Sequence, residues 1–283
     1  MNKIYKIAYF GGDPLGAPVL ERLVKTPFQP SLVVCNPDRP SGRGQKLAPP
    51  ATKVVAQSHG LEVAQPETLG ASFFQQSEWD LFIVVAYNKI LPEWLIELPK
   101  HKTINLHPSL LPKYRGANPI RTAILEDDKE LGVSIMLLDE KMDHGPILTQ
   151  AKAEIENWPI KGGQLDQILT DLGADLLLQT LPQWLTSNLK PQEQNHPDAS
   201  YTKKVSKQDG ELKLDPYNMP VGENAKQMYL KILAYDGWPG TFFFHDGRRY
   251  KVLEAHLDET GKLHIDSIVP EGKTDTPFLS HFK

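Results

Sequence analysis

The chain has 283 residues, of which 40% are hydrophobic and 23% charged, and its formal net charge is −4 at pH 7. This length suits one large or two medium globular domains, and the mild acidity excludes a basic nucleic-acid footprint over the whole surface while leaving room for a local basic patch. The single cysteine, Cys35, excludes an intrachain disulfide, no run is long and apolar enough to span a bilayer, and the first residues do not resemble a signal peptide, so we expect a cytoplasmic protein without a membrane partner.

The first part of the chain alternates short apolar runs with stretches of helical spacing. This order is typical of an α/β fold in which right-handed crossovers connect parallel strands. Residues 79–87 (WDLFIVVAY) form the most continuous apolar run and predict a central strand buried on both faces. The other apolar runs predict strands at 6–10, 31–35, 61–64, 103–106, 132–139 and 147–153, and helical spacing predicts helices at 18–24, 52–59, 93–98, 117–127 and 165–185.

Residues 36–50 (NPDRPSGRGQKLAPP) predict a long loop. It carries Arg39, Arg43 and Lys46 among glycines and prolines. Loops of this length are uncommon unless they have a function. Glycines let the backbone approach a ligand, and the cations suit phosphate. A solvated surface loop explains the same composition, so the residues by themselves leave both interpretations open.

Three polar side chains lie among apolar neighbours near the ends of predicted strands. Asn105 and His107 are two apart, and side chains at i and i+2 of an extended chain point to the same face. Asp143 begins a glycine-containing loop after the predicted strand 132–139. An amide, an imidazole and a carboxylate are able to handle a transferred acyl group and its protons. The alternative is a polar strand end beside a solvated loop.

The C-terminal part has a different texture. Residues 188–199 are polar and contain prolines, which predicts an interdomain linker. Beyond it, one helix at 225–233 and short strands separated by turns predict a small β-rich module, in which Lys and Arg are about matched by Asp and Glu. We place the domains at 1–187, a linker at 188–202 and the C-terminal domain at 203–283. The predicted strands of the module are 241–244, 249–253 and 263–269.

Several motifs, taken together, resemble the methionyl-tRNA formyltransferases nearly end to end. The sharpest is the run PDRPSGRGQK within 36–50, joined by VVAYNKILP at 84–92 and by NLHPSLLPKYRG at 105–116. Residues 131–148 with MDHG, Trp238-Pro239-Gly240 and PEGK at 270–273 continue the match. The Asn-x-His pair with a later Asp names only the wider group of formyltetrahydrofolate-dependent enzymes.

The resemblance implies a fold, a reaction and a set of site residues. The fold is a doubly wound, mostly parallel, Rossmann-like sheet followed by a smaller C-terminal β-rich barrel of the oligonucleotide-binding (OB) type. The reaction moves the formyl group of 10-formyltetrahydrofolate to the α-amino group of methionine on initiator methionyl-tRNA, for translation initiation. We also expect a monomer. We expect no metal, because the histidine spacing matches no usual zinc pattern. The implied residues are Asn105, His107 and Asp143 for catalysis; Ser109, Leu110, Leu111, Pro112, Tyr87, Ile90 and Leu91 for the folate; and Arg39, Arg43 and Lys46 for the tRNA.

The sequence departs from the family pattern in three places. Pro108 stands where many members have glycine, and Leu15 replaces a common aromatic residue. A stretch between about 259 and 263 is missing, so the C-terminal module is short. That shortening fits a formyltransferase for an amino sugar nucleotide, although the loop at 36–50 argues against one. A non-catalytic tRNA- or folate-binding protein is a second alternative, against which the intact polar triplet argues.

Overall fold

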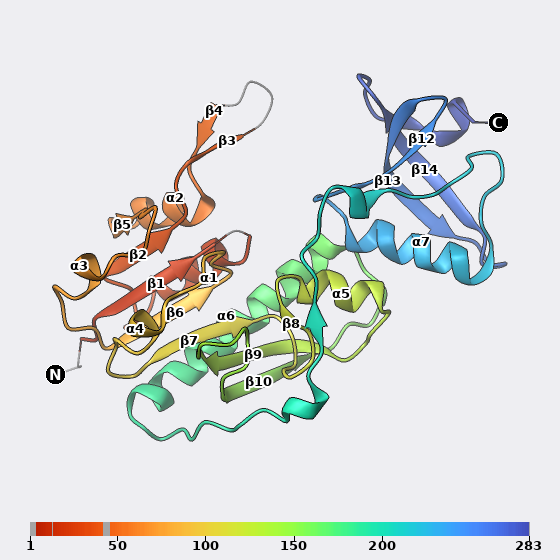
Figure 1. The fold of residues 1–283 in the computed structure, drawn as a ribbon. Helices are drawn as coiled ribbons and strands as arrows, with labels where there is room; N and C mark the ends of the chain where they lie inside the picture. Colours follow the sequence, from red (N-terminus) through yellow and green to blue (C-terminus); the bar gives the residue numbers. More distant parts are fainter. Residues whose placement is uncertain (1–3, 13, 42–45, 283) are drawn as a thin grey trace. The chain divides into compact units, whose positions relative to one another are not determined.

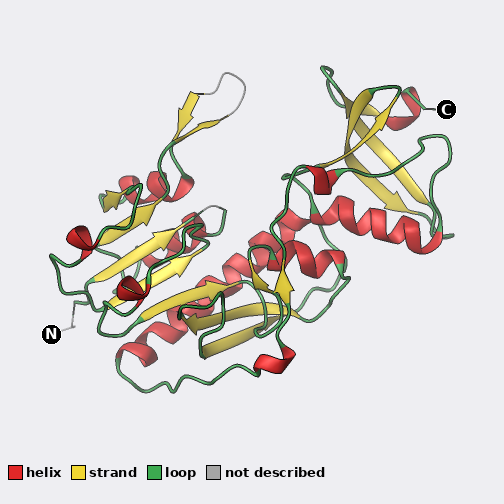
Figure 2. Cartoon of the chain, viewed as in Figure 1, coloured by secondary structure: helices red, strands yellow, loops and turns green. Residues whose placement is uncertain are grey.

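A computed structural model describes residues 4–12, 14–41 and 46–282, which divide into two compact units (Figures 1 and 2). The first unit comprises the described residues of Met1–Arg115, Glu130–Ala153 and Asp166–Tyr201. The second comprises those of Gly116–Lys129, Glu154–Leu165 and Thr202–Lys283. Each unit therefore contains more than one stretch of sequence, and the predicted domain boundaries at 187 and 203 remain a prediction.

The first unit is built on a seven-stranded sheet with the order β10-β9-β7-β6-β1-β2-β5. The strands from β5 to β7 in this order are parallel, whereas β9 pairs antiparallel with both β7 and β10. The predicted mostly parallel, doubly wound sheet is confirmed. Its strands are β1 (Ile7–Gly11), β2 (Leu32–Cys35), β5 (Glu62–Ala64), β6 (Leu81–Val85), β7 (Thr103–His107), β9 (Leu131–Leu137) and β10 (Ile147–Ala153).

The central strands are buried on both faces, and most of their residues are apolar. Every residue of β1, β6 and β7 is buried. On β7, Leu106 faces the long helix α6 (Gly162–Leu185), where a Cβ added to Gly173 would lie 2.8 Å from a Leu106 methyl carbon. Successive side chains of a strand alternate between its faces, so Asn105 and His107 project from the face opposite α6. The helices that lie wholly in this unit are α1 (Gly16–Leu23), α2 (Ala51–Ser58), α3 (Ala71–Phe74) and α4 (Glu93–Ile96).

The stretch predicted as a loop at 36–50 contains a short antiparallel ladder instead of loop alone. Strands β3 (Arg39–Ser41) and β4 (Lys46–Ala48) pair through Arg39 with Ala48 and through Pro40 with Leu47. The loop prediction was wrong here: Gly and Pro are typical of loops, but a two-stranded edge ladder tolerates a proline. Arg43 lies outside the described residues.

The second unit carries a small antiparallel sheet with the order β12-β13-β14-β15, which confirms the predicted β-rich C-terminal domain. Its core contains Phe243, Tyr250 and Ile268. Helix α7 packs against β13 and β14. Lys226 on α7 forms a 2.7 Å ion pair with Asp127, which follows α5. The elements of this unit are α5 (Pro119–Leu125), α7 (Gly222–Ala234), β12 (Thr241–His245), β13 (Arg248–Leu257), β14 (Leu263–Pro270) and β15 (Thr276–Pro277), with 3-10 turns at Gln208–Gly210 and Phe278–Ser280. Elsewhere in the chain, β8 (Arg115–Gly116) and β11 (Tyr201–Thr202) form a two-stranded ladder, and a 3-10 turn at His196–Asp198 lies in the first unit.

The connection between β13 and β14, where the sequence analysis expects a shortening, is a tight turn organised by Asp258. Its carboxylate accepts hydrogen bonds from the Thr260 backbone and hydroxyl at 2.8 and 2.7 Å and from the Lys262 backbone at 3.0 Å. His264 lies 2.8 Å away from its other oxygen. Bonds from Thr260 and His264 hold the pKa of Asp258 far below its usual range. The turn is thus held by several hydrogen bonds to one carboxylate, and β13 and β14 pair up to its two ends, Leu257 and Leu263.

Candidate active site

The predicted catalytic amide and imidazole project from the carboxyl end of β7. This strand lies between β6 and β9, with Asn105 opposite Val84 and Met136. The exposed fractions of Asn105 and His107 are 8% and 4%. Among the described residues, none forms a hydrogen bond with the Asn105 side chain, so this nearly buried amide keeps its donors for a ligand. Such an amide is costly to bury unless something binds it.

His107 is fixed through a backbone carbonyl. Its Nε2 lies 2.9 Å from the carbonyl oxygen of Tyr114, whose φ of +59° turns that oxygen toward the ring. A carbonyl oxygen only accepts, so Nε2 carries a proton. Nδ1 therefore faces Asp143, with its nitrogen 3.7 Å from Oδ1. This separation is too long for a hydrogen bond. A small approach of the two side chains would bring them within hydrogen-bond distance, where they could hold one proton between them.

Asp143 lies in a loop whose backbone leaves little freedom. Its φ is +49°, a left-handed conformation that aspartate tolerates better than most side chains. Two residues on, a Cβ added to Gly145 would lie 2.1 Å from the carbonyl oxygen of Leu137, so only glycine fits. Gln194 donates to the carbonyl oxygens of Asp143 and Gly145. The structure thus brings Asp143 to His107, and the sequence analysis missed Gln194 because it lies in the predicted linker.

The predicted folate run 109–112 follows β7 and is tied to β9 by Ser134. The Ser134 hydroxyl donates to the Ser109 carbonyl at 2.6 Å and accepts from the Leu111 backbone at 3.1 Å. Gln150 donates to the Leu111 carbonyl at 2.9 Å. Ser109 and Leu111 are buried, whereas Leu110 and Pro112 are half-buried. Ser134 lies within the matching stretch 131–148 but was given no role there, and Gln150 lies outside every motif.

The second predicted folate segment shows three different environments. Ile90 is 87% exposed, whereas Leu91 is buried. The ring of Tyr87 lies edge-on to Phe10, 5.6 Å between centroids. Among the described residues, its hydroxyl is the one buried side-chain polar atom without a hydrogen-bond partner. Burial, with a smaller contribution from Cys35, raises the pKa of Tyr87 to about 12.

Two of the predicted tRNA-binding cations, Arg39 and Lys46, lie on the paired strands β3 and β4, and Arg43 lies outside the described residues. Arg39 and Lys46 are exposed. The hairpin base is clamped by Asp38, which accepts from the Lys53 ammonium at 2.9 Å and from the Gln65 amide at 2.8 Å. These bonds, the one from Lys53 first, lower the pKa of Asp38. The clamp holds the chain next to Arg39, while Arg39 and Lys46 themselves stay exposed to solvent.

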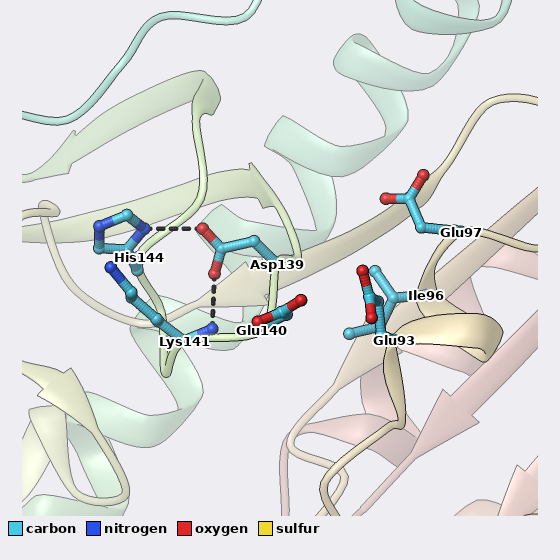
Figure 3. A pocket seen from close by; sticks show the side chains of 7 residues that line it. All are labelled: Glu93, Ile96, Glu97, Asp139, Glu140, Lys141 and His144. Carbon is cyan, nitrogen blue, oxygen red and sulfur yellow. Dashed lines mark hydrogen bonds and ion pairs between the residues drawn. The ribbon is translucent and has the colours of Figure 1, made fainter.

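A cavity of ≈ 330 Å³ lies beside the Asp143 loop (Figure 3). Its rim is acidic, and Glu140 raises the pKa of Glu93. Asp139 accepts from the Lys141 backbone at 2.9 Å and contacts His144 Nδ1 at 2.7 Å. None of the predicted site residues lines it; its lining consists of Glu93, Ile96, Glu97, Asp139, Glu140, Lys141 and His144.

In the part of the chain that the structure describes, no three His, Cys, Asp or Glu side chains gather as metal ligands would. No helix there has the length and apolarity that a bilayer crossing requires.

Comparisons with known proteins agree with this fold and constellation. A model of the formyl transferase family matches residues 5–181, and a model of the formyl transferase C-terminal domain matches residues 221–273. The chain belongs to the formyl transferase family. Its similarity extends to the methionyl-tRNA formyltransferase of Chloroflexus aurantiacus, which is 37% identical over 268 residues that cover 93% of this chain and 84% of the relative. The predicted resemblance is thereby confirmed.

Solved structures share the fold at much lower identity. The sugar 3N-formyl transferase WlaRD, determined with dTDP and 5-N-formyl-THF, has a TM-score of 0.67 at 17% identity, covering 96% of this chain and all (100%) of that one. The methionyl-tRNA formyltransferase from Clostridium thermocellum has a TM-score of 0.63 at 15% identity, with 94% and 98% covered. At these identities the likeness shows the architecture and does not distinguish between acceptors.

Proposed function

We propose that this enzyme transfers the formyl group of 10-formyltetrahydrofolate to the α-amino group of methionine on initiator methionyl-tRNA. The observation that carries the proposal is the constellation of Asn105, His107 and Asp143, in which an amide that no described residue bonds lies beside an imidazole–carboxylate pair. The identity of 37% to a methionyl-tRNA formyltransferase over most of both chains favours this acceptor over an amino sugar nucleotide. We further propose that the enzyme is a cytoplasmic monomer that needs no metal.

Asn105 is proposed to bind the formyl oxygen. Attack by the amine on the formyl carbon moves negative charge onto that oxygen, and the amide N–H groups stabilise it there. The amide is held on a rigid central strand, so it needs no reorganisation during the reaction. One such donor contributes about 3 kcal/mol of transition-state stabilisation in other acyl transfers.

His107 and Asp143 are proposed to hold the proton in transit. The amine attacks as a neutral group and loses one proton, and the folate nitrogen that releases the formyl group gains one. No net proton is consumed, so the pair only has to accept it and return it. Asp143 Oδ1, 3.7 Å from His107 Nδ1, is placed to accept the proton, and Tyr114 keeps Nε2 of the ring from turning away.

The folate is proposed to bind against residues 109–112 and against Tyr87, Ile90 and Leu91. The unpartnered hydroxyl of Tyr87 supports this, because a buried hydroxyl without a partner is stabilised by any ligand that bonds to it. Ile90, 87% exposed, offers an apolar surface that a bound heterocycle would cover. Covering it would also exclude water, which competes with the amine for the formyl group.

The tRNA is proposed to contact the β3–β4 hairpin through Arg39, Lys46 and Arg43, the last outside the described residues. The outer face of β12 and β13 supports a second contact. There Phe242 pairs with Lys251, and Arg249 lies 5.6 Å from the Phe242 ring centroid. Exposed aromatic rings beside cations bind unpaired bases and phosphates.

The average charge of the C-terminal module gave no indication of this face, because Lys and Arg are about matched by Asp and Glu over the module as a whole. Phe244, 52% exposed, stands opposite Arg249 on the same face as Phe242. Carboxylates lie at its edges: Glu211 is bridged to Phe242, and Asp246 lies in the β12–β13 turn. The cations are therefore concentrated between the aromatic rings, and the acidic residues sit at the margin.

The acceptor is tested by a formylation assay with purified methionyl initiator tRNA beside a panel of amino sugar nucleotides. Asn105→Ala and Asp143→Ala should each lower kcat by about 10²–10³-fold with folate affinity kept, because they remove transition-state contacts. Asn188→Ala, which removes an exposed amide outside the site, is the matched control. Preferential formylation of a sugar nucleotide would refute the acceptor, and near-normal turnover in either site variant would refute the catalytic assignment.

A further inference from the structure

We propose that Gln194 is a positioning residue for Asp143, and that the buried Arg115 holds it in the one orientation that does this. The proposal rests on the proposed function of Asp143. Gln194 is 5% exposed and lies in the polar stretch that follows α6. Nothing in the motifs of the sequence points to it, and the described side-chain hydrogen bonds of Gln194 are with Arg115, Asp143 and Gly145, all in the first unit.

The Gln194 amide nitrogen reaches two backbone carbonyls of the catalytic loop. It donates to the carbonyl oxygen of Asp143 at 2.9 Å and to that of Gly145 at 2.7 Å. These bonds use both amide hydrogens and bracket His144. Asp143 has a left-handed φ of +49°, and Gly145 has no room for a side chain, so this loop is over-determined by its backbone contacts. The direction of the Asp143 carboxylate follows from them.

Arg115 fixes which way the Gln194 amide points. The Gln194 oxygen accepts from Arg115 Nη2 at 2.6 Å and from Nε at 3.1 Å. A flipped amide would direct its NH₂ group at the guanidinium and its oxygen at two carbonyls, which is unfavourable on both sides. Arg115 itself is 1% exposed and donates from Nη1 to the Tyr201 hydroxyl at 3.1 Å. The amide orientation is therefore set by the network.

A stacked histidine pair covers the outer end of this network. Arg115 Nη2 lies 2.9 Å from His196 Nδ1, and the His196 ring stacks on His144 at 4.0 Å with an interplanar angle of 7°. Because a guanidinium only donates, His196 Nδ1 accepts from Arg115 Nη2. Desolvation, His144 and Arg115 lower the pKa of His196. His144 is the residue between the two bonded carbonyls, so the stack holds the same loop from its side-chain face.

The network governs both partners of the proton-holding pair. Tyr114 supplies the carbonyl that bonds His107 Nε2, and the next residue, Arg115, orients Gln194. His107 and Asp143 are thus placed relative to each other by adjacent residues of one segment. The 3.7 Å gap between them is the distance that Gln194 controls. A shift of about 1 Å in such a gap costs about 10²-fold in rate.

The rival interpretation is structural: Gln194 serves only to satisfy the buried Arg115. Gln194→Glu separates the two roles, because it keeps an acceptor for the guanidinium and removes both donors to the loop. We expect kcat to fall about 100-fold with the KM values for folate and acceptor within about threefold, since neither ligand contact changes. Gln192→Glu is the matched control, because it makes the same change two residues earlier on an exposed side chain. The described hydrogen bonds of Gln192 are made by its backbone, with Ile147, so the substitution leaves them in place.

A double-mutant cycle with Asp143→Asn gives the decisive readout. If Gln194 acts through Asp143, Gln194→Glu should cost no more than about twofold in the Asp143→Asn background, because interacting sites are not additive. Gln194→Asn keeps a neutral amide but withdraws it by one methylene, and should lower kcat at least tenfold even if a buried carboxylate impairs folding. Fully additive losses, or kcat within threefold of wild type in either folded variant, would overturn the positioning role.

The two proposals fail in different ways in this experiment. Absence of wild-type turnover with methionyl-tRNA refutes the proposed acceptor. The ratio of variant to wild-type kcat, measured on whichever acceptor of the panel is formylated, tests Gln194 independently of the acceptor's identity.

Discussion

The buried hydroxyl of Tyr87 gives a sharp test of the proposed folate pocket, through the variant Tyr87→Phe. In the described part of the chain this oxygen has no hydrogen-bond partner, and leaving a buried donor unsatisfied costs about 1–3 kcal/mol. Phenylalanine keeps the edge-on contact with Phe10, 5.6 Å between centroids. We therefore expect the ligand-free variant to be more stable than wild type by about 1 kcal/mol at pH 7.

The same hydroxyl makes the difference depend on pH. Burial raises the pKa of Tyr87 to about 12, so the folded state holds its proton more tightly than the unfolded chain, where the pKa is about 10. The raised pKa costs nothing below pH 10 and lowers wild-type stability as the pH rises from 10 toward 12. At pH 11 this adds about 1 kcal/mol to the advantage of the variant.

Urea unfolding at pH 7, 10 and 11 measures both effects, with Tyr217→Phe as the control at a tyrosine that is 63% exposed. Calorimetric titration with tetrahydrofolate completes the test. The hydroxyl that the variant lacks is proposed to bond the ligand, so its affinity should fall about tenfold while its stability rises. A variant less stable than wild type at pH 7 would show that the hydroxyl has a partner in the ligand-free protein, and unchanged affinity would remove Tyr87 from the folate pocket.

Two further predictions concern the tRNA. Arg39→Ala and Lys46→Ala should each raise the KM for methionyl-tRNA and reduce the slope of log affinity against log salt by about 1, with folate affinity unchanged; Lys25→Ala, an exposed cation on the first unit, should do neither. Equal losses of tRNA and folate affinity would contradict this division of labour. Phe244→Ala should raise the same KM about tenfold without lowering kcat, because one stacked base is worth about 1–3 kcal/mol; the exposed Phe73→Ala is the control, and an unchanged KM would exclude stacking at the C-terminal face.

Short-range patterns predicted much of the fold. The apolar run at 79–87 became the buried strand β6, and the i, i+2 spacing placed Asn105 and His107 on one face of β7. Cys35 is a buried strand residue, as its apolar neighbours indicated. The short ladder within 36–50 was not predicted, because the glycines and prolines of this stretch are typical of a loop. The average charge of the C-terminal module likewise concealed the alternation that puts its cations and aromatic rings on one face of β12 and β13.

By itself, the sequence determined where the strands lie and which residues form the motifs, because backbone preference and side-chain alternation act over a few neighbouring residues. Only the tertiary structure decided which distant residues meet. Antiparallel pairing of β9 with β7 brings Asp143 within 3.7 Å of His107. A stretch with the composition of a linker supplies the buried Gln194. The unpartnered hydroxyl of Tyr87 likewise has no signature in the chain. Burial and hydrogen-bond satisfaction depend on every segment that packs around a group, and no local pattern contains that information.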